Sequence, residues 1–169
     1  MELSALQYIT SRWIAATAQF RAMDVLLWLE KRGANVNAED PYGRMPMHLA
    51  AEGGHVEAMK RLKEQGANVN AEVDYNGRTP IYWAASRGHI EAMKWLKEQG
   101  VDVNAKSNRG WYGGTLMHAA AGSGHVEVMK WLKEQGADIN AKNDSGWTAT
   151  IELRVNVTGL RIARPHGVK

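Results

Sequence analysis

Three segments of the chain place apolar residues at intervals of three along a helix, with charged residues between them. In the first segment Val56, Met59 and Leu62 fall on one side of a predicted helix, while Lys60 points toward water. The three copies read HVEAMKRLKEQGANVNAE from His55, HIEAMKWLKEQGVDVNAK from His89 and HVEVMKWLKEQGADINAK from His125. One unit of this size cannot bury its own apolar face, so the copies must stack side by side.

A turn and a shorter predicted helix precede each copy. The turn reads Asp-x-x-Gly, in which Asp bonds back to the chain and Gly accepts positive φ. Thr79 and Thr115 suit the N-cap, and Pro46 and Pro80 suit the first helical position, where a missing N–H costs nothing. The glycines expected to end the helices are Gly54, Gly88 and Gly124 for the shorter ones, and Gly66, Gly100 and Gly136 for the longer ones.

The order of turn, first helix, second helix and a closing G-A-D-V-N-like stretch resembles the ankyrin repeat, with its T-P-L-H-x-A motif and period of about 33 residues. The blocks that carry the resemblance run from Asp40 to His55, from Asp74 to His89 and from Thr115 to His125, and the match covers roughly residues 12–150. The resemblance implies an all-α fold, a solenoid of stacked antiparallel helix pairs with projecting β-turn or hairpin loops.

The repeat divides the chain into five units. They are a divergent N-terminal capping repeat (1–39), ankyrin repeats at 40–72 and 73–106, a repeat with a loop insertion (107–142), and an atypical C-terminal partial repeat or tail (143–169).

Spacing within the array is uneven, since His55 and His89 are 34 residues apart whereas His89 and His125 are 36 apart. The extra residues fall in turns, one near Val73 and three within 107–114. Residues 151–157 alternate between apolar and polar and favour a strand. An edge pairing, a weak helix against the last repeat and disorder all remain open for them.

Charge and composition narrow the function. Residues after position 150 account for the whole net charge of +3, and the body before them has 17 basic and 17 acidic residues. A nucleic-acid-binding array would be basic along one face, so no nucleic-acid partner is expected. Cysteine is absent, no apolar run could span a bilayer, and the amino terminus is too polar for a signal peptide. We expect no membrane association and a cytoplasmic location, with a nuclear or host-cell location left open.

Five of the six histidines recur at two positions of the repeat. His48 and His118 occupy the T-P-L-H position, and His55, His89 and His125 precede the second helix. The resemblance implies that they hydrogen-bond the turns of adjacent repeats. A metal site needs ligands converging within about 2 Å of one ion, whereas stacked repeats hold equivalent side chains a layer apart. No catalytic or phosphate-binding motif is present. We expect no enzyme activity, cofactor, metal or small-molecule substrate.

Aromatic residues fall into two groups. Trp28, Trp95 and Trp131 share one position in the second helix, where Arg61 stands in one repeat, and we expect them to pack between layers or at their rim. The others lie in turns or on the first helices, where the resemblance implies contact positions, although they could instead cover loop backbone. The candidate partner-binding residues are Tyr42, Arg44, Leu49, Tyr75, Arg78, Trp83, Arg87, Trp111, Tyr112 and Trp147.

The sequence therefore indicates a non-enzymatic scaffold that binds an unidentified protein partner through its concave groove and turn tips. Aromatic side chains would anchor the partner, and arginines would pair with its carboxylates. The alternative is a structural or targeting fragment of a larger protein that self-associates through its C-terminal end. We expect a monomer, with a homodimer through that end as the other possibility.

Overall fold

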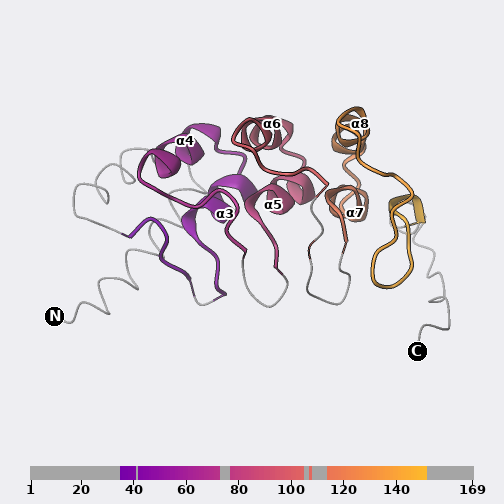
Figure 1. Cartoon of the computed structure of the whole chain (residues 1–169), viewed down its shortest axis with the longest axis horizontal. Coiled ribbons are helices and arrows are strands. Elements are labelled where there is room, and N and C mark those ends of the chain that lie inside the picture. The colour runs from indigo at the N-terminus through magenta and orange to yellow at the C-terminus, as the bar shows by residue number, and fades with distance from the viewer. Residues whose placement is uncertain (1–34, 41, 73–76, 105–106, 108–113, 152–169) are drawn as a thin grey trace.

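Helix pairs stacked in two rows make up the fold. The computed structural model describes residues 35–40, 42–72, 77–104, 107 and 114–151. The pairs are α3 (Pro46–Glu52) with α4 (Val56–Glu64), α5 (Pro80–Arg87) with α6 (Ile90–Glu98), and α7 (Leu116–Gly122) with α8 (Val126–Glu134). The second helices α4, α6 and α8 form an outer row, and the first helices α3, α5 and α7 form an inner row (Figure 1). The turn before α3 and the turn after α8 project beyond the inner row. The predicted all-α solenoid is confirmed.

Strands are absent from the residues that the structure describes, where Lys142 and Thr148 form an isolated antiparallel bridge. Ser107 N–H donates to the carbonyl of Gly114 (3.0 Å), so the two ends of the predicted loop insertion meet. Residues 149–151 form a helical turn, in which Ile151 N–H donates to Thr148 O (3.0 Å). At Ile151 the helical alternative therefore holds, and the strand that the alternation favours is wrong. The rest of 151–157 lies outside the described residues, as do 1–34.

The first helices begin where the sequence predicts. Pro46 and Pro80 occupy the first helical position, and Thr79 and Thr115 are extended N-cap residues. The Thr79 side chain makes no capping hydrogen bond. The Thr115 hydroxyl instead lies 2.9 Å from Nδ1 of His118, so its role is to hold that imidazole.

Glycines in the left-handed region reverse the chain between first and second helices. Gly54, Gly88 and Gly124 have φ values of 69°, 81° and 76°, which confirms the predicted reversal points. At two of them the next repeat also approaches closely. A Cβ on Gly54 would lie 2.6 Å from Nδ1 of His89, and one on Gly88 would lie 2.8 Å from Nδ1 of His125. Glycine is therefore required here both by the backbone and by interrepeat packing.

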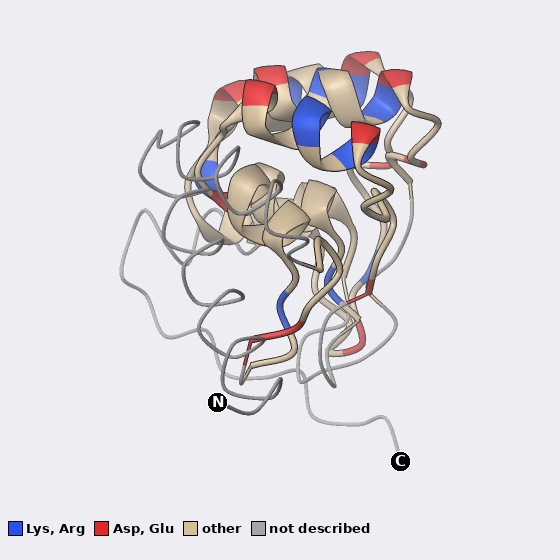
Figure 2. Cartoon of the chain, turned by 90° about the vertical axis from the view of Figure 1, so that its left-hand side faces the viewer, with Lys and Arg blue, Asp and Glu red and all other residues tan. Residues whose placement is uncertain are grey.

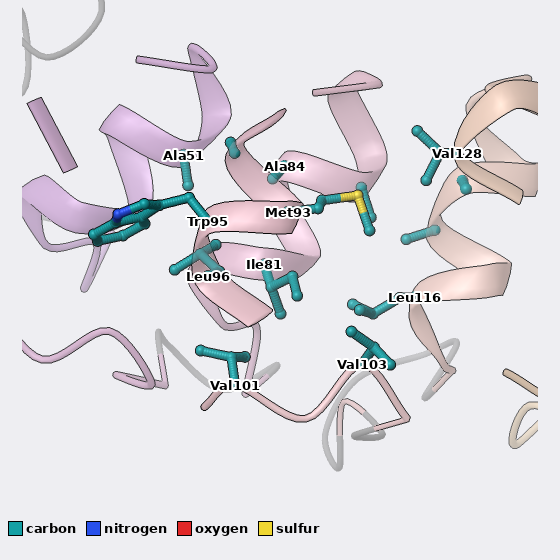
Figure 3. Close-up of a cluster of buried hydrophobic side chains, with 14 of the residues drawn as sticks. Ala51, Ile81, Ala84, Met93, Trp95, Leu96, Val101, Val103, Leu116 and Val128 are labelled. Atoms are coloured by element: carbon teal, nitrogen blue, oxygen red, sulfur yellow. The ribbon is translucent and has the colours of Figure 1, made fainter. Parts of the chain in front are cut away.

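The core lies between the two rows and runs through every described repeat. Inner-row alanines such as Ala51 and Ala84 are fully buried, and their small size allows neighbouring first helices to approach closely. Outer helices contribute larger side chains such as Met93 and Leu96 (Figure 3). One continuous core shared by adjacent repeats explains why no single repeat would be stable alone.

The recurrent tryptophan position lies at the edge of this core. Trp95 is 9 % exposed and extends from α6 toward the preceding repeat (Figure 3), which confirms that it packs between layers. Trp131 is half-buried against the same core, and Trp28 lies outside the described residues. Arg61, at the same position in α4, is exposed and pairs with Glu64 (3.2 Å).

Among the helices, charged residues are concentrated on the outer row (Figure 2). Each outer helix carries one Glu–Lys pair at spacing i,i+3, namely Glu57–Lys60, Glu91–Lys94 and Glu127–Lys130. Lysines also donate across repeats, from Lys63 to Gln99 and from Lys97 to Gln135. Such exposed pairs stabilise little individually. They do leave the outer face with most of its cations next to an acceptor of the same chain.

Candidate partner-binding face

The turn before α3 is built on one aspartate. Oδ1 of Asp40 accepts hydrogen bonds from the backbone N–H groups of Tyr42 and Arg44, both at 2.9 Å, and Asp40 N–H donates to Arg44 O (2.9 Å). Gly43 at φ 75° completes the turn. The Tyr42 ring at its tip is 71 % exposed. The turn thus holds its backbone rigidly and presents an aromatic ring to solvent.

The turn after α8 repeats this construction with an amide. Oδ1 of Asn143 accepts from the N–H groups of Ser145 (3.0 Å) and Trp147 (2.9 Å), and Gly146 has φ 77°. Trp147 stands where Arg44 stands in the earlier turn, and its side chain is half-buried. The two turns therefore present different chemistry on the same backbone.

In α3 and α7, a histidine ties the turn before the helix to the backbone that follows the next helix. Nε2 of His48 lies 2.8 Å from the carbonyl of Ala71, and Met45 N–H donates to Nδ1 (3.2 Å). Because Nδ1 accepts, the proton of the neutral ring sits on Nε2. Burial lowers the pKa of His48 to about 4, because an imidazolium in this site would lose its hydration. Protonated Nδ1 would also carry an N–H that faces the N–H of Met45. His118 is held likewise, with Nε2 2.9 Å from Trp147 O.

Histidines before the second helices bond backward to the preceding repeat. Nε2 of His89 lies 3.0 Å from Glu52 O, and Nε2 of His125 lies 3.1 Å from Ser86 O. Burial, together with the neighbouring His55 and His125, lowers the pKa of His89. These contacts confirm the structural role predicted for His48, His89, His118 and His125. No group of three metal-ligating side chains occurs in the described part of the chain.

One glutamate joins two arginines from successive repeats. A carboxylate oxygen of Glu52 lies 3.5 Å from Nη1 of Arg44, and the other lies 2.5 Å from Nη2 of Arg87. Arg44 also pairs with Asp40 at 2.8 Å and lies 5.3 Å from the centroid of the Tyr42 ring. The result is a network that crosses from the first turn to the end of α5.

Arg78 is held differently. Its guanidinium carbon lies 5.4 Å from the centroid of the Tyr82 ring and 5.5 Å from that of Trp83. No carboxylate among the described residues lies within ion-pairing distance of it. The indole N–H of Trp83 is buried, and no described residue accepts a hydrogen bond from it. We call Tyr42, Arg44, Arg78, Tyr82, Trp83 and Arg87 the arginine–aromatic face.

The structure brings together five of the sequence-predicted contact residues and separates others from them. Tyr42, Arg44, Arg78, Trp83 and Arg87 lie on the first two turns and helices of the described array. Leu49 is 5 % exposed and belongs to the core, so its prediction as a contact residue is wrong. Trp147 lies two turns further along, and Tyr75, Trp111 and Tyr112 lie outside the described residues.

Sequence reasoning missed two members of this arrangement. Glu52 shows its role only in the fold, because its partner Arg87 is 35 residues away. Tyr82 occupies the histidine position of T-P-L-H, which by itself indicates a structural side chain rather than part of a binding face. The arginine four residues before it is the available signal, because the turn brings the two side chains together.

Comparison with known families agrees with the geometry. A family model described as "Ankyrin repeats (3 copies)" matches residues 13–107, and one described as "Ankyrin repeats (many copies)" matches residues 116–150. No curated protein matches the chain. Ankyrin repeats generally serve as protein–protein interaction modules and are typically non-enzymatic. In the described residues no helix is long and apolar enough to cross a membrane. The first family model covers more than half of the chain, which therefore belongs to the ankyrin repeat family.

Proposed function

We propose that the chain is a non-enzymatic scaffold that binds a protein partner with its concave groove, the side formed by α3, α5, α7 and the turns before them. The observation that carries the proposal is the arginine–aromatic face. Arg78 stacks on Tyr82 and Trp83, and Glu52 joins Arg44 to Arg87, which lies on the same helix as Tyr82 and Trp83. Three arginines and three aromatic residues thus gather over two repeats.

The chemistry of this face suits a protein interface. Trp, Tyr and Arg are enriched among residues that dominate binding energies. Their side chains are already ordered by stacking and ion pairs, so binding costs less conformational entropy. At the positions equivalent to Trp83 and Arg87, the next repeat has Ala119 in α7 and Ser123 directly after α7. The bulky contacts therefore concentrate on α5 and on the turns before α3 and α5. The sequence adds Trp111 and Tyr112, between α6 and α7, as further candidates.

Affinity purification with the full chain, followed by mass spectrometry, would identify partners, and calorimetry with the purified partner would test the surface. We expect Trp83→Ala and Arg87→Ala each to weaken binding at least about tenfold. Arg61→Ala is the matched control, because Arg61 lies on the outer row and is exposed. Circular dichroism confirms that each variant is folded. Affinities within about twofold of the original for both variants would refute this surface.

A further inference from the structure

Resting on the proposed function, we propose that the segment bound by this face is acidic, with a carboxylate that docks on Arg78 beside an apolar side chain that packs on Trp83. The partner is a protein segment in which an Asp or Glu adjoins an apolar residue. The reasons lie in which arginines already have a carboxylate and in how Arg78 is held.

Intramolecular carboxylates already neutralise two of the three arginines on the face. Arg44 pairs with Asp40 and Glu52, and Arg87 pairs with Glu52. Arg78 has the same place in its turn as Arg44, directly after a glycine at positive φ. It nevertheless pairs with no carboxylate of the described residues, so none of them neutralises the positive charge of Arg78.

Arg78 is also prepared to accept a carboxylate. The two rings hold its guanidinium in place, which reduces the entropy lost when the side chain is fixed. A guanidinium presents paired N–H donors that match the two oxygens of a carboxylate. Trp83 is half-buried, so part of its ring surface remains open to an apolar side chain next to that carboxylate.

A nucleic acid fits this face less well than a peptide. Phosphates follow one another along a strand, and binding them takes several uncompensated cations. Here Asp40 and Glu52 lie close to the flanking arginines and would repel neighbouring phosphates. One cation that no described carboxylate neutralises, on a face whose two other arginines are neutralised, suits a single carboxylate of the partner.

Peptide display against the full chain would test the inference without a known partner. A library of random 12-residue linear peptides is selected for binding, and the strongest binder is synthesised together with its amide form, in which Asn and Gln replace Asp and Glu. We expect selected peptides to be enriched in Asp or Glu next to an apolar residue. The amide form and Arg78→Gln should each weaken binding about tenfold or more. Arg78→Lys keeps the positive charge but not the paired N–H donors, so it should weaken binding less than Arg78→Gln does.

Two further variants sharpen the result. Arg61→Gln, the outer-row control, should bind like the original chain. Asp74 precedes Arg78 by four residues in the sequence, as Asp40 precedes Arg44. Asp74→Asn should therefore bind the acidic peptide at least as tightly as the original, because it removes a negative charge. Weaker binding by Asp74→Asn would contradict the inference, since it would mean that the peptide presents a cation there.

The remaining outcomes separate this inference from the proposed function. Neutral or basic peptides that depend on Trp83 but not on Arg78 would overturn the acidic partner and leave the binding face intact. Peptides insensitive to changes at both Trp83 and Arg78 would overturn the face itself. A single-stranded oligonucleotide that binds through Arg78 more tightly than the selected peptides would also overturn the inference. Thermal melts of every variant exclude loss of folding as the cause.

Discussion

Replacing Gly54 by alanine should destabilise the chain by an amount that its neighbour His89 determines. Two costs add. At φ 69° an alanine Cβ is strained by about 1–2 kcal/mol. The new Cβ would also lie 2.6 Å from Nδ1 of His89, so the imidazole must move. Its hydrogen bond to Glu52 O is then lost, and a poorly solvated carbonyl remains, at a cost of about 1–3 kcal/mol.

Gly66→Ala is the matched control, because Gly66 has φ 87° and a Cβ added to it would meet nothing within 4 Å. It should show only the backbone cost. Urea unfolding followed by circular dichroism measures the free energy of unfolding of both variants. In thermal melts, each kcal/mol of destabilisation should lower Tm by about 2–4 °C. In a His89→Ala background, Gly54→Ala should cost no more than Gly66→Ala does. Equal destabilisation by the two glycine variants in the original chain would refute the argument that His89 packs against Gly54.

Two more predictions concern stability. His48 has a pKa of about 4 in the folded chain against 6.5 when unfolded, so the unfolded chain binds the extra proton first and stability falls as pH drops from 6.5 toward 4. About 3 kcal/mol of this loss, measured by urea unfolding at several pH values, should vanish in His48→Gln; an unchanged pH dependence would contradict it. The three residues at the equivalent position of the outer helices differ in burial, so their replacement by alanine should destabilise the chain to different extents. Trp95→Ala should lower the free energy of unfolding by about 3–5 kcal/mol, Trp131→Ala by less, and Arg61→Ala by no more than about 0.5 kcal/mol. Equal decreases in Tm for the three variants would show that side-chain burial does not determine how much this position contributes to stability.

Much of the fold could be predicted because its signals are local. Periodic apolar residues specify the outer helices, Pro46 and Pro80 mark where inner helices begin, and glycines at positive φ mark their ends. The strand prediction is wrong at Ile151, where the alternating pattern conflicts with the threonine three residues earlier. Alternation describes a strand only if a partner strand exists, whereas an N-cap requires nothing beyond its own helix.

The candidate site was harder to predict because its contacts connect different repeats. Leu49 occupies the same position as Trp83, yet it is buried in the core while Trp83 is half-buried under Arg78. The position of a residue in the repeat predicts which face of the helix it lies on, but not how deeply its side chain is buried. The pairing of Glu52 with Arg87 likewise depends on how adjacent repeats are offset, which periodicity alone does not reveal.

Part of the proposed binding face comes from a position at which one repeat differs from the others. In two repeats the T-P-L-H position holds His48 or His118, whose ring nitrogens join the N-cap backbone to a neighbouring turn. Tyr82 has no ring nitrogen to accept the N–H of Thr79, and its ring instead lies under Arg78. The middle repeat thus lacks a structural imidazole and has in its place an aromatic ring that belongs to the proposed face. A stacked array tolerates that exchange because its flanking repeats keep the histidine, so the repeat that departs from the pattern is the one free to take a binding role.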